Sequence, residues 1–176
     1  MHGILFKQLK TYVSDRWDDD VWTESMDEAG IEPKLYLPVT DYPDDEAMRL
    51  IDAVTTVTGV DRRELLDDFG ESLAPALLDT FKAHVKDDWG AMDLLEHSGN
   101  EVFEVLRSEN AVDEVTAERT AEDTVVVEYG SSLELCTMAK AIVRGLADEH
   151  GESVDVTERA CAKQGADACE IRVTRT

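Results

Sequence analysis

Residues 124–149 read TVVVEYGSSLELCTMAKAIVRGLADE and join two different hydrophobic periods. The first part, residues 124–129, is rich in β-branched side chains, a composition that favours a strand. Over residues 135–146 the apolar side chains recur every three or four positions, which predicts an amphipathic helix. Ser131 and Ser132 lie between the two parts and are candidate N-caps of that helix. The stretch therefore predicts a strand that leads directly into a helix.

The residues on either side of this stretch predict more strands. Residues 115–118 are a probable partner of the first strand, and residues 154–161 and 169–174 form two strands about a turn at Gly165. Gly151 is placed to end the helix between them. The C-terminal part is therefore predicted to be an antiparallel sheet with a packed helix.

Up to about residue 108 the hydrophobic pattern is helical. Asp44 and Asp61 are expected as N-caps, and Gly30 and Gly59 as C-terminal stops. The expected helical stripes cover residues 5–17, 21–26, 48–54, 65–69, 73–81 and 92–107. We therefore predict an α+β fold in one domain over residues 1–176, with a helical subdomain at 1–108 and an α/β subdomain at 109–176.

The charge balance is strongly acidic. The 176 residues carry 40 Asp and Glu against 17 Lys and Arg, a net charge of −23. The acidic residues form short runs between apolar positions, a pattern typical of a solvated coat on a folded surface. We expect a halophilic protein, with an ordinary acidic protein as the alternative. Nucleic acid is not an expected partner, because its recognition needs a basic patch.

Other features concern the compartment. No apolar stretch approaches 18 residues, so no membrane span is predicted, and the N-terminus is too polar after Phe6 for a signal peptide. Three cysteines, an odd number, argue against a disulfide framework. A cytoplasmic location is therefore expected.

No catalytic triad, phosphate-binding loop or paired catalytic carboxylates stand out, so we do not expect an enzyme.

Several short segments resemble one known family. They are MHGILF at 1–6, YPDDE at 42–46, LDDFG at 66–70, YGSSL at 129–133 and IVRGLA at 142–147. Together they resemble the haem nitric-oxide/oxygen-binding (H-NOX) domains of soluble guanylate cyclase and of bacterial gas sensors. The resemblance covers nearly the whole chain. It implies a sensory domain that binds haem b and a diatomic gas and acts on a separate signalling protein.

The resemblance assigns two residues to the haem propionates and shows two departures. Tyr129 and Ser131 match the tyrosine and serine of the family's Tyr-x-Ser-x-Arg motif, but Leu133 replaces the arginine. The position that aligns with the axial histidine holds Phe103, or Val102 in the neighbouring register. Neither side chain has an atom that binds iron.

The four histidines do not supply an obvious replacement. His97 precedes Phe103 by six residues, so on a helix it points to a different side. His2 starts the first expected helix, and His84 and His150 have no motif around them. A surface residue is the favoured interpretation of each.

The cysteines predict a metal site. Cys161 and Cys169 lie four residues on either side of Gly165, which makes them cross-strand neighbours in a hairpin. Cys136 lies on the helix expected to pack on that sheet. Three such thiolates suit one zinc ion. The alternative is a small core cysteine beside a reduced or oxidised pair.

The cysteine spacing also resembles the zinc site of a subset of H-NOX proteins. Their fourth ligand, a histidine, aligns with Glu158, whose carboxylate can bind zinc. A regular strand puts positions three apart on opposite faces, so either a bulge or a water molecule as the fourth ligand is needed. The same C-terminal segment resembles 4-vinyl-reductase-type domains. Two other functions therefore stay open: a module that binds a small apolar molecule or a tetrapyrrole, and a haem-free interaction scaffold.

Overall fold

The structure, a computed structural model, describes residues 1–107, 115–130 and 133–176. Its helical elements are α1 (Gly3–Arg16), α2 (Asp19–Glu28), α3 (Asp44–Thr58), α4 (Arg62–Phe81), η1 (Lys82–His84), α5 (Ala91–Phe103), η2 (Glu104–Leu106), α6 (Cys136–Glu149) and η3 (Ala162–Gln164). Its strands are β1 (Thr116–Ala121), β2 (Thr124–Tyr129), β3 (Val154–Ala160) and β4 (Cys169–Arg175). The α+β fold class predicted from the sequence is confirmed.

The ends of the helices follow local signals in part. Asp61 caps α4 as predicted, and its carboxylate accepts from the amide of Arg63 at 2.8 Å. The prediction that Asp44 is an N-cap is wrong. Asp44 is the first residue of α3, and its buried carboxylate accepts a hydrogen bond from the α-amino group of Met1 at 2.9 Å. The charged donor of this hydrogen bond comes from a distant part of the chain.

Two further expectations about helices are corrected. The stripes at 65–69 and 73–81 belong to one helix, α4, which continues through Pro75. Helix α6 begins at Cys136 with Leu135 as N-cap and no side-chain cap, so neither Ser131 nor Ser132 caps it. Both serines lie outside the described residues.

The four strands form one antiparallel sheet in the order β1-β2-β4-β3. Side chains alternate across it, so that Val125, Val127 and Tyr129 of β2 are buried while Glu128 is exposed. The partner of Val127 across the ladder is Ile171 of β4, which is also buried. Only one face is apolar, and α5 and α6 pack against the sheet.

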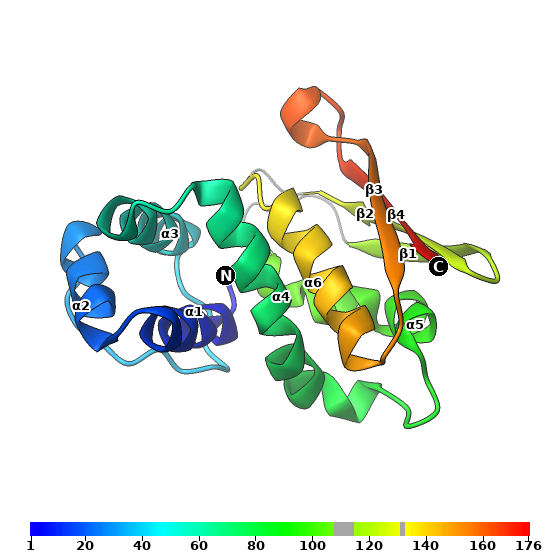
Figure 1. The fold of residues 1–176 in the computed structure, drawn as a ribbon, viewed down its shortest axis with the longest axis horizontal. Coiled ribbons are helices and arrows are strands. Elements are labelled where there is room, and N and C mark those ends of the chain that lie inside the picture. Colours follow the sequence, from blue (N-terminus) through cyan, green and yellow to red (C-terminus); the bar gives the residue numbers. More distant parts are fainter. Residues whose placement is uncertain (108–114, 131–132) are drawn as a thin grey trace.

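Helices α4 and α6 connect the two halves of the molecule. In Figure 1, α1, α2 and α3 lie at one end, the sheet lies at the other, and α4 and α6 cross between them. Arg144 of α6 pairs with Asp67 at 2.6 Å and with Glu71 at 2.7 Å, both on α4. One hydrophobic core runs through both halves. The predicted subdomain boundary at residue 108 lies outside the described residues.

The helices were also assessed for membrane crossing. In the parts of the chain that the structure describes, none is both long enough and apolar enough to span a bilayer.

Candidate functional site

Three cysteines from distant parts of the chain meet at one end of the sheet. Their sulfur atoms all lie within 4.8 Å of one another, and the side chains of Cys136, Cys161 and Cys169 are buried. Cys136 is the first residue of α6, Cys169 is the first residue of β4, and Cys161 directly follows β3. The juxtaposition predicted from their spacing is therefore present. We call these residues the three-cysteine cluster.

The β3–β4 hairpin positions two of the sulfurs. Ala160 pairs with Glu170, so Cys161, the next residue, faces Cys169. The connection tightens through η3 and reverses at Gly165, whose φ of 94° suits glycine. The amide of Ala162 donates to the sulfur of Cys169 at 3.4 Å. An N–H bond of this kind favours the thiolate form of a cysteine.

Burial works against ionisation of the cluster. Burial, and to a smaller extent the neighbouring Cys169, raise the pKa of Cys136 to about 12. Burial also raises the pKa of Cys169 above its ordinary value. The thiols of Cys136 and Cys169 are therefore protonated at neutral pH unless a cation compensates their charge. A divalent metal provides that compensation, because it binds the thiolate form.

Glu158 lies beside the cluster and outside it. A bulge between Glu158 and Ala160 supplies the irregularity that the sequence argument required. The carboxylate forms an ion pair with Lys140 at 2.9 Å. Burial raises the pKa of Glu158, but hydrogen bonds with Lys140 and Cys161 outweigh burial and keep the pKa below its ordinary value. Its oxygens do not join the group formed by the three sulfurs.

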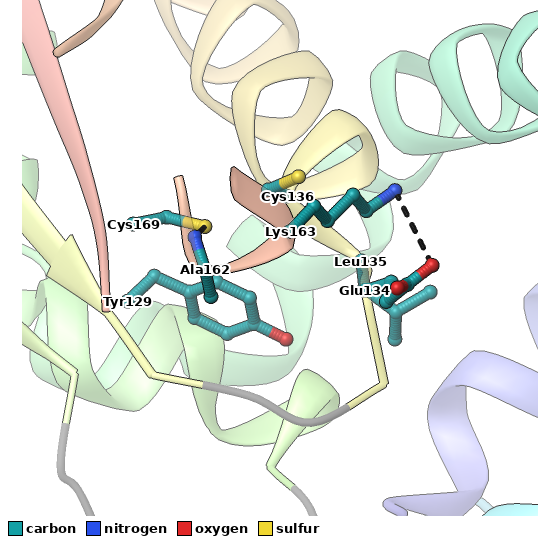
Figure 2. A pocket seen from close by; sticks show the side chains of 7 residues that line it. All are labelled: Tyr129, Glu134, Leu135, Cys136, Ala162, Lys163 and Cys169. Atoms are coloured by element: carbon teal, nitrogen blue, oxygen red, sulfur yellow. Dashed lines mark hydrogen bonds and ion pairs between the residues drawn. The ribbon is translucent and has the colours of Figure 1, made fainter. Parts of the chain in front are cut away.

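A cavity of about 130 Å³ opens next to the sulfurs. Figure 2 shows the residues that line it: Tyr129, Glu134, Leu135, Cys136, Ala162, Lys163 and Cys169. Lys163 reaches across one side toward Glu134, with 3.9 Å between the charged atoms. Sequence reasoning missed Lys163, Glu134 and Lys140. The spacing of Cys136 and Lys140 by one helical turn was the available signal for the last of these.

The three-cysteine cluster fits a zinc ion. Tetrahedral zinc with Zn–S bonds of about 2.3 Å separates its sulfurs by roughly 3.8 Å. Sulfurs that already lie within 4.8 Å need only a small contraction to reach that separation. The donors are all soft thiolates, the type that selects zinc over magnesium or calcium. In the described residues no other group of histidine, cysteine or acidic side chains converges in this way.

The residues expected around a haem lie in the adjacent part of the core. The rings of Phe103 and Tyr129 lie 6.4 Å apart, and both side chains are buried. The Tyr129 hydroxyl donates to the carbonyl oxygen of Leu106 at 3.5 Å. Leu133 is partly buried against the hydrophobic core. Ser131, the second expected propionate contact, lies outside the described residues.

The sequence model of one family, described as haem-NO-binding, matches residues 2–158 of this chain. The chain belongs to the haem-NO-binding family. Domains of this family, also called H-NOX domains, are haem-based gas sensors, and this confirms the family resemblance of the sequence. No curated protein matches the chain.

Solved structures of H-NOX proteins share the fold. An H-NOX protein from S. oneidensis in the Fe(II)NO state has a TM-score of 0.84 and 18% identity, with 100% of this chain and 99% of that chain covered. An Fe(II)CO form from the same organism has a TM-score of 0.83 and 19% identity, with 100% and 99% covered. An unliganded Fe(II) mutant from K. algicida has a TM-score of 0.79 and 16% identity, with 100% and 97% covered.

The interior of this H-NOX domain does not fit a histidine-ligated haem. Phe103, or Val102 in the neighbouring register, is the residue that the family resemblance leads us to expect at the axial position, and neither side chain has a donor atom. A haem-sized cavity would leave accessible surface on the side chains around it, yet Phe103, Val105 and Leu106 are 0% exposed. Helix α1 also contacts η2 directly, with no layer between them.

The four histidines are exposed or only partly buried. His97 is half exposed and stacks on Trp89, with the ring centroids 4.8 Å apart. His84 is exposed, His2 caps α1, and a ring nitrogen of His150 lies 2.7 Å from the carbonyl oxygen of Leu146. None of them is buried in the core. The interpretation of the histidines as surface residues agrees with these positions.

Proposed function

We propose that this H-NOX domain is a sensor whose signal enters at the three-cysteine cluster, which binds one zinc ion under reducing conditions. The observation that carries the proposal is the convergence of Cys136, Cys161 and Cys169 within 4.8 Å in a buried setting. Phe103, which the family resemblance places at the axial position, is fully buried and has no donor atom, and this supports an input other than histidine-ligated haem b.

Zinc, when bound, neutralises the thiolates and cross-links α6 to the β3–β4 hairpin. The cysteines supply the redox chemistry. A peroxide accepts two electrons from the thiolates of Cys161 and Cys169, its O–O bond breaks to give two hydroxide ions, and one S–S bond forms. Only the thiolate of Cys136 then remains as a metal ligand, so oxidation would release the metal. A cytoplasmic setting keeps the resting state reduced.

The position of the cluster supports a route for the output. Cys136 begins α6, and α6 packs along α4, which leads toward the N-terminal helices. We propose that a change at the cluster alters α6 and is read by a separate signalling protein. A diatomic gas is the input that the family implies, and a small apolar ligand is the input that the resemblance to 4-vinyl-reductase-type domains implies. Both stay open as signals of this domain, and we do not propose that it turns over a substrate.

The test is metal content. Reduced, purified protein is expected to carry about one zinc per chain, and Cys161→Ser is expected to lose most of it, because two thiolates bind the ion more weakly than three. Thr157→Ser, at an exposed position of β3, is the matched control and should keep its zinc. Peroxide should release zinc from the native protein in step with the loss of free thiols. A metal-free native protein, or full zinc content in Cys161→Ser, would contradict the proposal.

A further inference from the structure

The three-cysteine cluster has three donors for a metal that takes four. Tetrahedral zinc either receives its fourth ligand from the protein or keeps that position open to a small molecule. In the described residues the group of converging donors ends at the three sulfurs. The carboxylate of Glu158, beside the cluster, forms an ion pair with Lys140 at 2.9 Å. The fourth position is therefore not supplied by this group.

The cavity of about 130 Å³ opens beside two of the three cysteines, so a small molecule in it lies within reach of a metal held by the cluster. Cys136 and Cys169 both line it, whereas Glu158 does not. Its volume is roughly four times the ~30 Å³ that one water molecule occupies in the liquid. A ligand of about six heavy atoms therefore fits, and the end of the ligand away from the metal lies at the opening of the cavity.

The lining determines the chemistry of the occupant. Leu135 and Ala162 offer apolar surface for a short carbon chain. Lys163 adds a cation to the same lining, and its charged atom lies 3.9 Å from that of Glu134. One end of the occupant lies beside a metal that already has sulfur ligands, and such a metal prefers a further soft ligand. These features match a molecule with a thiolate at one end and a carboxylate at the other.

We propose that the cavity binds a small carboxylate-bearing thiol, whose sulfur completes the coordination of the metal and whose carboxylate pairs with Lys163. The inference rests on the metal site of the proposed function and identifies its external ligand class. It makes the cluster a site that responds to the supply of low-molecular-weight thiols.

The experiment uses the full chain loaded with Co²⁺, whose visible bands report the donor set. Titration with 3-mercaptopropionate should shift these bands and saturate at one ligand per metal. Two probes separate the parts of the ligand: 3-mercapto-1-propanol lacks the carboxylate and should bind roughly threefold more weakly, the effect of one exposed ion pair. Propionate lacks the thiol and should leave the bands unchanged. Metal content measured after each titration excludes extraction of the ion.

Two variants locate the contacts. Lys163→Met should abolish the preference for 3-mercaptopropionate over 3-mercapto-1-propanol while the cobalt content stays the same. Lys82→Met, on an exposed lysine of η1, is the matched control and should keep the preference. Glu158→Gln should leave both metal content and thiol response in place.

The outcomes separate this inference from the proposed function. If the chain takes up no cobalt and no zinc, the metal site itself fails and this inference fails with it. If cobalt binds but no thiol shifts its absorption bands, the proposal of an external thiol as fourth ligand is contradicted and the metal site stands. If Glu158→Gln weakens cobalt binding tenfold or more, Glu158 is the fourth ligand and the external thiol is excluded.

Discussion

The carbonyl oxygen of Glu71 in α4 faces Gly145 in α6, where a Cβ atom would lie only 2.6 Å from it. In a regular helix this carbonyl accepts from the amide four residues later, but residue 75 is Pro75, which has none. Gly70 makes the reciprocal approach, since a Cβ there would lie 2.6 Å from that of Ala141. The two helices therefore cross at a distance that only glycine permits.

Gly145→Ala should destabilise the protein by about 1–3 kcal/mol, because the new methyl group must push the backbone of α4 away. The free energy of unfolding from urea denaturation measures the effect. Asp148→Ala, at an exposed position of the same helix, is the control and should change stability by less than about 0.5 kcal/mol. Equal stability of Gly145→Ala and the native protein would show that the crossing adapts without cost.

Zinc should stabilise the native fold through the three-cysteine cluster. Free zinc at about 100 times its dissociation constant is expected to add about 2.7 kcal/mol to the free energy of unfolding, since only the folded chain assembles the three donors. Cys169→Ser should show almost none of this gain. The effect should weaken as the pH falls, because protons compete with the metal for thiols whose pKa is already raised by burial. Thermal unfolding with and without a chelator provides the measurement.

Haem should bind the native protein substoichiometrically and without the spectrum of a five-coordinate ferrous histidine complex. The physical reason is the combination of Phe103 at the axial position, Leu133 in place of a basic residue, and a filled core. Haem titration followed by absorbance tests this. His97→Ala should leave the titration unchanged, whereas loss of stoichiometric binding in that variant would identify His97 as the ligand.

Tyr12 should be a source of instability at high pH. Its hydroxyl is buried without a hydrogen-bond partner in the described residues, and burial raises its pKa to about 12. The unfolded chain ionises near pH 10 while the folded chain stays neutral, so stability present below pH 10 is lost as the pH rises toward 12. Tyr12→Phe should reduce this loss and add up to about 1 kcal/mol at pH 7. Urea denaturation across pH 8–12 provides the measurement, and identical pH profiles for the two proteins would contradict the assignment.

Salt should stabilise the fold strongly. The net charge of −23 produces self-repulsion in the folded state, and the screening length falls from about 10 Å at 0.1 M salt to about 3 Å at 1 M. The melting temperature should therefore rise from low to molar KCl. Sucrose at matched osmolality, which screens no charge, serves as the control. A flat response to KCl would show that the acidic coat does not limit stability.

Strong local signals predicted the strands and part of the site. The β-branched run at 124–129 became β2 with both ends as expected, and the symmetry of Cys161 and Cys169 about Gly165 identified the hairpin pair. These features depend on residues close in sequence, whose periodicity and turn chemistry are readable without the fold.

Other features depend on partners that are distant in sequence, and these were missed. Asp44 has the residue type of an N-cap, but the α-amino group of Met1 takes its carboxylate. The cavity depends on the turn that gives Glu134 a φ of 57° and brings it toward Lys163. Sequence periodicity contains no information about such long-range contacts, because they form only when the elements pack.

The order of the three cysteines along the chain has a kinetic consequence. Cys161 and Cys169 are eight positions apart in a hairpin, a structure that forms in about 1–10 μs, whereas Cys136 lies 25 positions before Cys161. Closure of the longer loop costs only slightly more entropy, but it also requires the docking of α6. A metal ion present during folding therefore binds first to a weak site of two sulfurs. Tight binding requires the third sulfur and so occurs only after α6 has docked.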